Sequence, residues 1–273
     1  MITKYPRTPH LEGSNLAPGD SAADRVLIRE ITRLFPSALW VVEEKLDGAN
    51  TGLSADLETF DLVPQSRGHP LRGGAREGQF SAFKEWATVH EAAILDVLED
   101  RYVSYHEWTW AVHTKYYDAL PHYLHEFDLL DRNTGRFLST AARREALRGS
   151  PFVSVPVLYE GPAPSSIAEL TSLVRPSLYQ TPSWREALRE ASALAGVPHE
   201  VMEKATRDDD LSEGLYVKIE DGDETVARFK WVRHGFVQTI LDNGQHWSER
   251  PIVRNRLADG VDIMAAPGVA PSP

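Results

Sequence analysis

One lysine stands where a predicted strand meets a turn, a place suited to a covalent nucleophile. In the stretch VVEEKLDGAN, Lys45 ends a run typical of a buried strand, and the Asp47-Gly48 pair after it permits a turn. A lysine amine attacks phosphorus only when neutral, so its pKa must fall from about 10.4 through burial or neighbouring positive charge. Lys45 is therefore a candidate nucleophile, provided that cations and carboxylates surround it.

Further segments after Lys45 carry the side chains that such chemistry needs. They are QSRG with Arg67, YHEW with Glu107, EFDLLD with Phe127, EGLYVK with Glu213 and Lys218, and ARFKWV with Arg228 and Lys230. Ammonium groups can hold phosphate oxygens while charge develops in an in-line displacement. Carboxylates suit hard divalent cations or ribose hydroxyls. The chain has no cysteine, which excludes a thiol nucleophile and thiolate metal sites.

Taken together, the six segments from Glu44 to Lys230 resemble the ordered motifs of the covalent lysyl-nucleotidyltransferases, the superfamily of ATP-dependent DNA ligases, RNA ligases and capping enzymes. The sequence EKLDGAN is most similar to the nucleophile motif of the RNA ligase branch. The resemblance implies an α+β protein with the nucleotidyltransferase fold, an ATP-grasp-like DNA/RNA ligase fold with antiparallel sheets around an ATP cleft. It also implies an ATP-dependent RNA ligase that joins 3′-hydroxyl and 5′-phosphate ends through lysyl-AMP and RNA-adenylate, in RNA repair.

The resemblance also assigns roles to individual residues. Lys45 would be the nucleophile, and Lys218 and Lys230 would be the catalytic cations at the α-phosphate. The nucleotide-binding set would be Glu44, Asp47, Gly48, Asn50, Arg67, Glu107, Phe127, Glu213 and Arg228. Phe127 would stack on the base, and Glu107 and Glu213 would hold Mg²⁺ or Mn²⁺ beside ATP. RNA is the expected partner, and an end-healing kinase or phosphatase protein is left open as a second one.

Two positions depart from the motifs of that superfamily. His106 stands where a glycine usually precedes the motif glutamate, which affects the backbone geometry there. Arg228 replaces the first lysine of K-x-K, so the charge is kept but a planar fork replaces a compact ammonium. The first departure could shift the fit of the nucleotide, and the second could shift the handling of phosphate.

The alternation of side chains along a strand, here called strand parity, provides a check on these residue roles. Arg228 and Lys230 are two residues apart and share one face of a strand, as a pocket-facing pair requires. Glu213 and Lys218 have opposite parity in EGLYVK. Both can reach one nucleotide only if Glu213 lies on the turn or bulge that enters the strand.

The elements that position these residues follow from hydrophobic periodicity and turn signals. Helices are predicted over 21–35, 79–98, 184–195 and 201–206, and strands over 39–46, 102–110, 124–130, 152–158, 214–220 and 225–232. The last two strands form a hairpin across Asp221-Gly222. Residues 1–240 are expected to form the adenylyltransferase domain with a helical insertion at about 162–210. Residues 241–273 would be a short extension with a disordered tail, since about 40 residues after Lys230 are too few for an OB-fold.

Composition limits the class of protein. The chain has 273 residues, of which 42% are hydrophobic and 25% charged, and its net charge is −11. The absence of any apolar run near about 18 residues, and of a signal peptide, predicts a cytoplasmic protein without membrane association. The acidic balance argues against non-specific coating of nucleic acid, although a local basic groove remains compatible with it.

Other interpretations stay open at this stage. The alternatives within the superfamily are a DNA ligase and a capping-type core. From other classes, the chain could be a non-catalytic nucleotide- or RNA-binding subunit, or a metal hydrolase built on His122-x-x-His125. The acidic run RDDD at 207–210 is interpreted as a solvated face or helix-end charge.

Overall fold

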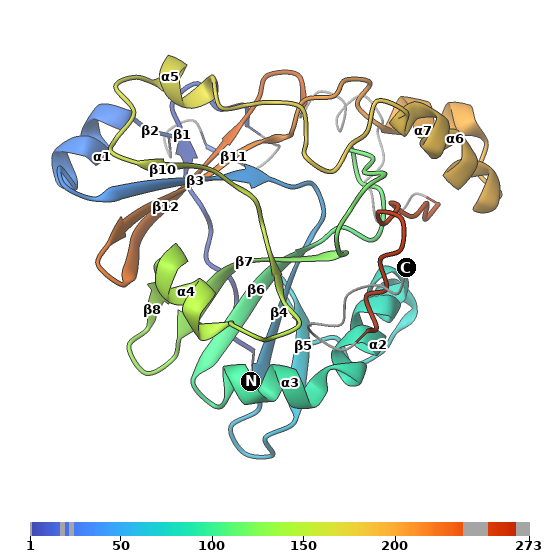
Figure 1. The fold of residues 1–273 in the computed structure, drawn as a ribbon, viewed down its shortest axis with the longest axis horizontal. Helices are drawn as coiled ribbons and strands as arrows, with labels where there is room; N and C mark the ends of the chain where they lie inside the picture. Colours follow the sequence, from blue (N-terminus) through green and yellow to red (C-terminus); the bar gives the residue numbers. More distant parts are fainter. Residues whose placement is uncertain (1, 17–19, 22–24, 237–250, 266–273) are drawn as a thin grey trace.

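The computed structural model describes residues 2–16, 20–21, 25–236 and 251–265 (Figure 1). The strands are β1 His10–Leu11, β2 Arg25–Val26, β3 Leu39–Lys45, β4 Ala49–Ala55, β5 Leu62–Ser66, β6 Tyr102–Trp108, β7 Leu124–Asp131, β8 Arg136–Leu138, β9 Val153–Ser154, β10 Val157–Gly161, β11 Gly214–Asp221 and β12 Glu224–Val232. The helices are α1 Ile28–Leu34, α2 Ser81–Val89, α3 Glu91–Leu98, α4 Thr140–Ala146, α5 Ile167–Thr171, α6 Trp184–Leu194 and α7 His199–Ala205, with a 3₁₀ helix η2 at Ala75–Phe80.

The described strands form one continuous sheet in the order β10-β3-β11-β12-β8-β7-β6-β4-β5, and all neighbours along this path are antiparallel. Short parallel pairings add β1 and β2 beside β12, and β9 beside β7. The predicted α+β class with antiparallel strands is confirmed. The strands form two groups, β10-β3-β11-β12 and β7-β6-β4-β5, and β8 joins them into one sheet rather than leaving separate sheets.

The strands β3, β11 and β12 have one apolar and one polar face, because their side chains alternate. Trp40 and Val42 of β3 point to the apolar face, which packs against Ile31 of α1 and Leu170 of α5. Glu43 and Lys45 therefore point to the opposite face. Figure 1 shows α1 and α5 close to this group of strands. The buried apolar face fixes the register that delivers Lys45 to the polar side.

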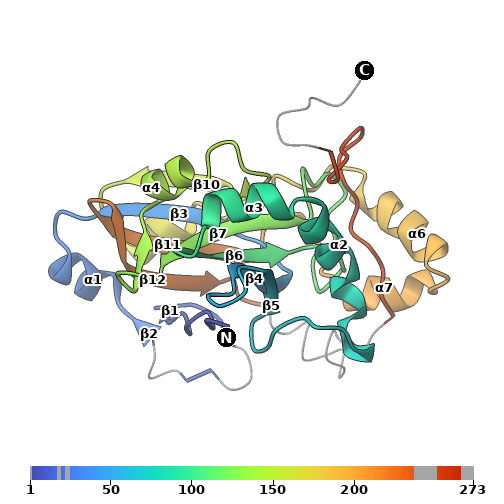
Figure 2. The same cartoon turned by 90° about the horizontal axis from the view of Figure 1, so that it is seen from below.

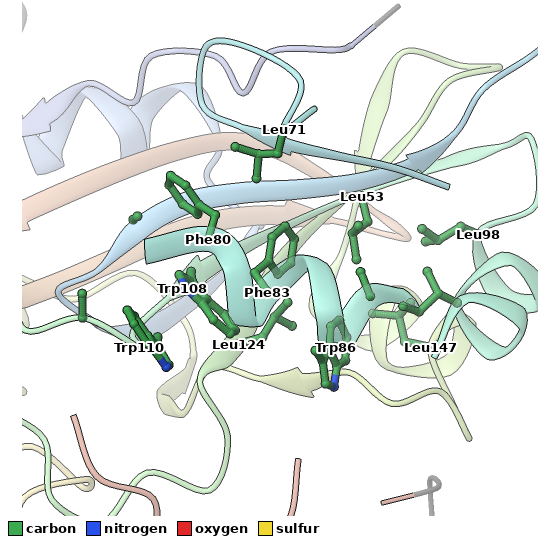
Figure 3. Close-up of a cluster of buried hydrophobic side chains, with 14 of the residues drawn as sticks. Leu53, Leu71, Phe80, Phe83, Trp86, Leu98, Trp108, Trp110, Leu124 and Leu147 are labelled. Carbon is green, nitrogen blue, oxygen red and sulfur yellow. The ribbon is translucent and has the colours of Figure 1, made fainter. Parts of the chain in front are cut away.

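The strands β4, β6 and β7 are covered on their outer face by α2 and α3. Phe83 and Trp86 of α2 pack against Leu53 of β4 and Trp108 of β6 in this cluster (Figure 3). The Trp108 indole also donates a hydrogen bond to the Gln79 carbonyl oxygen at 2.9 Å. This core holds β6, and with it Glu107, against its neighbours.

The polar faces of the two groups of strands are turned toward each other. Lys218 of β11 contacts the backbone oxygen of Phe127 and the Asp128 carboxylate, both on β7. Arg143 of α4 bridges Glu43 of β3 and Glu126 of β7. The space between the two groups is thus lined by charged residues that must pair with one another or with a ligand.

The helices α6 and α7 lie together at one end of the molecule, beside the strands (Figure 2). Trp184 and Leu188 of α6 and Met202 of α7 pack against Val112 and Tyr116, which follow β6 in the chain. A separate apolar cluster therefore attaches these helices to the loop between β6 and β7.

Several predicted elements differ in detail from the structure. The helix predicted over 21–35 begins only at Ile28, because Arg25 and Val26 pair with β1 as a strand. The helix predicted over 79–98 is two helices that break at His90, whose side chain contacts the Ile263 carbonyl oxygen. The strand predicted over 152–158 divides into β9 and β10 around Pro156.

Strands β4 and β5 were not predicted from the sequence. ANTGLSA alternates correctly, but its small and polar residues weaken the hydrophobic signal. The predicted boundary at 240 and the predicted disordered tail at 266–273 lie outside the described residues. Within the described residues, no helix is long and apolar enough to cross a membrane.

Candidate active site

Lys45 lies at the end of β3 in an ion pair with Glu213. Its Nζ is 2.7 Å from Glu213 Oε2, and the two side chains are 22% and 10% exposed. Burial alone would lower the pKa of Lys45, but the carboxylates of Glu213, Glu107 and Asp47 outweigh it and raise the pKa. These carboxylates therefore favour Lys45 as an ammonium, whereas a lysine that attacks phosphorus must be neutral.

The turn after Lys45 is fixed through the buried Asp47 side chain. Asp47 Oδ2 accepts hydrogen bonds from the backbone N–H groups of Thr114 at 2.6 Å and Lys115 at 2.7 Å. The Asp47 N–H donates to the Tyr117 hydroxyl at 2.9 Å. The loop after β6 thereby holds the nucleophile's turn in place.

Gly48 has no room for a side chain. A Cβ there would lie 2.6 Å from the Trp108 carbonyl oxygen, a backbone atom that cannot swing away. The Gly48 N–H also donates a hydrogen bond to Glu107 Oε1 at 2.9 Å. The glycine of K-x-D-G is thus required by the close approach of β6, and that approach brings Glu107 toward Lys45.

Glu213 reaches Lys45 because it precedes β11 rather than lying within it. Gly214 pairs with Lys45 in the antiparallel register, so Glu213 lies at the turn that enters the strand, as the parity argument required. A Cβ on Gly214 would meet the Trp231 carbonyl oxygen at 2.0 Å. The glycine lets β12 approach closely at the point where Glu213 meets Lys45.

Lys230 supplies positive charge on the same side of the sheet as Lys45. Burial lowers the pKa of Lys230, and the nearby charges of Lys45 and Arg67 lower it further. Lys230 Nζ lies 3.8 Å from Asp20 Oδ2, and Asp20 also contacts His10 Nε2 at 2.9 Å. Arg67 follows β5 and is exposed to solvent.

Three carboxylates, those of Glu107, Glu213 and Asp47, surround the single ammonium of Lys45. Burial, opposed by the Lys45 charge and reinforced by nearby carboxylate charge, raises the pKa of Glu107 and of Glu213 to about 7 each. Burial likewise raises the pKa of Asp47. Three carboxylates around one cation form a site with unbalanced negative charge.

That donor set fits a divalent cation held together with phosphate. Mg²⁺ is typically bound by one or two carboxylates plus substrate phosphates, and Glu107 and Glu213 provide two carboxylates of this kind. Among the described residues, no three or more His, Asp or Glu side chains are arranged so that they could hold a metal ion by themselves. A cation beside Glu107 and Glu213 would therefore need further ligands from a bound phosphate.

The histidine-based hydrolase is not supported by the structure. His122 Nδ1 accepts a hydrogen bond from the Leu124 N–H at 2.8 Å, and the His125 ring stacks on Tyr179. Burial lowers the pKa of His122 to about 4 and of His125 to about 3. Both rings therefore pack between β7 and its neighbours, an arrangement that does not favour a metal hydrolase.

Lys218 is buried apart from Lys45. Its Cα pairs with Val41, four residues before Lys45 and about 13 Å along the strand. Its ammonium lies 3.1 Å from Glu43 Oε1 and 3.2 Å from Asp128 Oδ1, with both carboxylates fully buried. Its charge is therefore already balanced by protein groups, which does not favour the predicted role at the α-phosphate.

Arg228 also contacts protein groups rather than Lys45. Its guanidinium lies 3.4 Å from Asp128 Oδ2 and 3.5 Å from the centre of the Phe137 ring. It also lies over the Tyr5 ring. Tyr5 in turn packs edge-on against Phe127, with ring centres 5.2 Å apart. The residue predicted to stack on a base is thus part of an aromatic cluster that the N-terminal segment completes.

Glu44 and Asn50 occupy different positions relative to the nucleophile. Glu44 alternates with Lys45, and its carboxylate accepts a hydrogen bond from the Leu178 N–H at 3.3 Å on the other side of the sheet. Asn50 lies directly opposite Glu107 in the β4–β6 pair. The structure thus places Asn50 beside the site, but it does not bring Glu44 there.

Sequence reasoning missed several residues that organise this region. They are Tyr5, Glu43, Asp128, Arg143, Tyr117 and Asp209. Glu43 and Asp128 adjoin quoted motif residues, so strand parity could have shown which face each occupies. Tyr5, Arg143 and Asp209 carry no local signal, since their partners are far away in the sequence.

Comparison with known proteins agrees with the fold and with the predicted family. The fold is that of the nucleotidyltransferase-type ligases. The family model described as RNA ligase matches residues 38–232, which is more than half of the chain. The chain therefore belongs to the RNA ligase family. Comparison with curated proteins gives no match.

Solved structures of Naegleria gruberi RNA ligase share the fold. A variant with ATP and Mn has a TM-score of 0.54 at 15% identity, covering 87% of this chain and 58% of that one. The ligase with PPi gives 0.52 at 15% identity, with 88% and 62% covered. A variant with AMP and Mn gives 0.51 at 14% identity, with 85% and 63% covered. The chain thus spans about three fifths of the length of these ligases.

Proposed function

We propose that this protein is an ATP-dependent RNA ligase that works through covalent adenylylation of Lys45. The reaction would have three steps. Lys45 takes AMP from ATP, AMP passes to an RNA 5′-phosphate, and an RNA 3′-hydroxyl displaces AMP to seal the ends. Family membership supports the class of reaction, and the site around Lys45 supports the nucleophile.

The observation that carries this proposal is the set of charged groups around Lys45 Nζ. Glu213 is 2.7 Å away, Glu107 and Asp47 are close enough to shift its pKa, and the positive charge of Lys230 lies on the same side. A solvated bystander lysine would have no such surroundings. A nucleophile for a triphosphate needs both the cation and the carboxylates.

In the first step, Lys45 would take AMP from ATP, and residues of this chain would handle the proton and the charge. The Lys45 nitrogen forms a bond to the α-phosphorus, the bond from that phosphorus to the bridging oxygen breaks, and pyrophosphate leaves. Lys45 must first lose a proton. Glu213 Oε2 at 2.7 Å is a suitable acceptor before a cation occupies that carboxylate, because burial raises its pKa to about 7. Lys230 would stabilise negative charge on the α-phosphate oxygens.

Mg²⁺ or Mn²⁺ beside Glu107 and Glu213 would supply charge neutralisation for these carboxylates and the triphosphate. With the carboxylates so engaged, burial and Lys230 would lower the pKa of Lys45 toward the neutral amine. Phe127 would form one wall for the adenine. Asn50 and Arg67 would contact the ribose and the phosphate of the end to be sealed.

RNA is the proposed polynucleotide, recognised by A-form shape and 2′-hydroxyl contacts near the break. The Naegleria gruberi structures are of RNA ligase, which favours this substrate over DNA. An end-healing kinase or phosphatase partner and a cytoplasmic location stay predictions from the sequence.

Incubation with α-labelled ATP and Mg²⁺, followed by denaturing electrophoresis, tests the covalent step. We expect label on the wild-type protein and none on Lys45→Ala. Lys45→Arg should also stay unlabelled, because a guanidinium does not lose its proton under these conditions. Lys204→Ala, which removes an exposed lysine of α7, is the matched control and should label normally. Label that persists in both Lys45 variants would exclude the lysyl-AMP mechanism.

The choice of substrate needs a separate assay. Matched 5′-phosphorylated nicks and single strands would differ only in whether the last two nucleotides on the 3′-hydroxyl side carry ribose or deoxyribose. We expect faster sealing with ribose, and sealing that weakens as salt rises, because phosphate contacts release counterions. Equal or faster sealing with deoxyribose ends would assign the protein to DNA ligation instead.

A further inference from the structure

The acidic run RDDD contains one aspartate that is unlike its neighbours. Asp208 and Asp210 are exposed and contact Arg185 of α6. Asp209 is less exposed and accepts hydrogen bonds from Arg207 Nε at 2.8 Å and Arg233 Nη1 at 2.8 Å. Asp210 also accepts a hydrogen bond from the buried Trp184 indole at 2.8 Å. The charge run is therefore exposed at two positions and an internal anchor at the third.

Asp209 also holds Lys115, whose side chain is fully buried. The Lys115 ammonium donates a hydrogen bond to the Asp209 carbonyl oxygen and lies 3.8 Å from Asp209 Oδ1. It also lies over the Trp184 ring of α6, 5.9 Å from its centre. Lys115, Arg207, Asp209 and Arg233 together are called the Asp209 cluster below.

The Asp209 cluster is connected by backbone hydrogen bonds to both sides of the nucleophile. On one side, the Lys115 N–H donates to Asp47 Oδ2 at 2.7 Å and so holds the turn after Lys45. On the other side, the Arg233 N–H donates to the Glu213 carbonyl oxygen at 3.1 Å. Asp47 and Glu213 are two of the three carboxylates that surround the Lys45 ammonium.

We propose that the Asp209 cluster is a positioning device, in which Asp209 fixes Asp47 and Glu213 relative to Lys45. This inference rests on the proposed function, since it assigns a purpose to the placement of the nucleophile. The Asp209 carboxylate lies beside the side-chain cations of Lys115 and Arg233. The backbone N–H of Lys115 binds the Asp47 carboxylate, and the backbone N–H of Arg233 binds the main-chain carbonyl oxygen of Glu213. The segment 172–212 is thereby tied through Asp209 to the two sides of the reaction centre.

The contacts explain why an aspartate is needed at this position. Lys115 and Arg233 are both buried, so each requires a compensating anion. Asparagine at 209 would keep the size but remove the charge. Lys115 and Arg233 would then repel each other with less compensation, since of the anions near Lys115 only the more weakly acting Asp210 and Glu44 would remain. The two backbone segments to which these cations belong could then move apart. A shift of about 1 Å at a reaction centre can lower a rate by about 100-fold.

The test compares Asp209→Asn with Asp208→Asn in single-turnover adenylylation. Asp208→Asn makes the same chemical change at an exposed neighbour and is the matched control. The full-length protein, cleared of bound AMP with pyrophosphate, is mixed with α-labelled ATP and Mg²⁺. The final amount of label reports the folded, active fraction, whereas the rate constant reports the geometry of the site.

We expect the rate constant of Asp209→Asn to fall at least about tenfold, with its final labelling close to that of the wild type. Asp208→Asn should keep the wild-type rate constant. Lys115→Met removes the ammonium but keeps the N–H that binds Asp47, so it should slow labelling less than Asp209→Asn does. Unchanged rate constants, or a loss of final labelling alone, would overturn the inference, because the latter indicates only a loss of fold.

A second measurement needs no nucleotide. Trace acetylation of Lys45, followed by mass spectrometry across a pH range, reports the environment that Glu213, Glu107, Asp47 and Lys230 create around the amine. If Asp209→Asn loosens the carboxylates, Lys45 should react at lower pH than in the wild type. An unchanged profile would contradict the positioning role. Absence of ATP labelling in the wild type would instead contradict the proposed function, and the acetylation profile would still decide the inference.

Discussion

The Lys45 ammonium lies 2.7 Å from the Glu213 carboxylate, so the proposed nucleophile is paired with a group that raises its pKa. The pairing opposes the neutral amine that the proposed attack needs. It also places the proposed proton acceptor and the proposed nucleophile in direct contact. The contact that favours the ammonium is therefore also suited to take its proton in the proposed reaction.

Glu213→Gln should have two opposite effects on Lys45. Without the carboxylate charge, the pKa of Lys45 should fall, and the free amine should acetylate about tenfold faster at pH 8 for each unit of that fall. Adenylylation by ATP should nevertheless drop on the order of 100-fold, because a proton acceptor and a metal ligand are lost. Acetylation and labelling assays on the same preparation measure both. Glu203→Gln on the exposed face of α7 is the control, and parallel changes in both assays would contradict this account.

We expect Lys230→Ala to lower mainly the rate of adenylylation and Arg228→Ala to lower mainly the stability of the fold. The Lys230 side chain lies on the same side of the sheet as Lys45. The loss of its charge should therefore reduce adenylylation on the order of 100-fold with little loss of stability. Arg228 contacts Asp128 and the Phe137 ring, so its loss should mainly lower the free energy of unfolding. Arg228→Lys should retain more activity than Arg228→Ala. Urea unfolding together with ATP labelling separates the two, and full labelling in Lys230→Ala would show that the motif is misassigned.

The sequence could predict those features of the site that depend on local patterns, such as which residues share one face of a strand. Alternation in β12 placed Arg228 and Lys230 on one face, and parity required Glu213 to precede β11, which is where it lies. Periodicity could not reveal β4, because its side chains are small. It also could not distinguish Asp209 from Asp208, since only the arrival of Lys115 and Arg233 from distant segments makes one of them an anchor.

Charge alone likewise could not separate the proposed catalytic lysines from Lys218. Lys218 and Lys230 both belong to quoted motifs, yet Lys218 is fully buried between Glu43 and Asp128. Those carboxylates come from β3 and β7, about 90 or more residues away in the chain, and the pairing depends on how the two groups of strands face each other. No pattern within either motif carries this information.

Arg143→Met should destabilise the protein strongly. The Arg143 guanidinium bonds Glu43 at 2.7 Å and Glu126 at 2.9 Å, and all three side chains are fully buried. Removing the cation leaves carboxylates buried with incomplete compensation, which typically costs about 3–5 kcal/mol. Arg144→Met, the exposed neighbour on α4, should change the free energy of unfolding by less than about 0.5 kcal/mol. Urea unfolding at pH 7.5 checks this, and equal effects of the two substitutions would contradict the buried network.

His106 should make the protein sensitive to acid. Its ring is fully buried against Phe152 and Phe83, where burial and the nearby His122 lower its pKa to about 3. As pH falls below about 6.5, the unfolded chain takes up a proton that the folded chain excludes, so stability falls between about 6.5 and 3. At pH 5 this contribution amounts to about 2 kcal/mol for one histidine.

His106→Phe removes that contribution while keeping an aromatic ring of similar size. We expect the loss of stability between pH 7.5 and pH 5 to be about 2 kcal/mol smaller in His106→Phe than in the wild type, with the remaining loss due to groups such as His122 and His125. Urea unfolding at the two pH values measures the difference. His234→Phe, at an exposed position after β12, should leave the pH dependence as it is in the wild type. An identical pH dependence in His106→Phe would mean that the ring can accept a proton within the fold, which its apolar surroundings do not support.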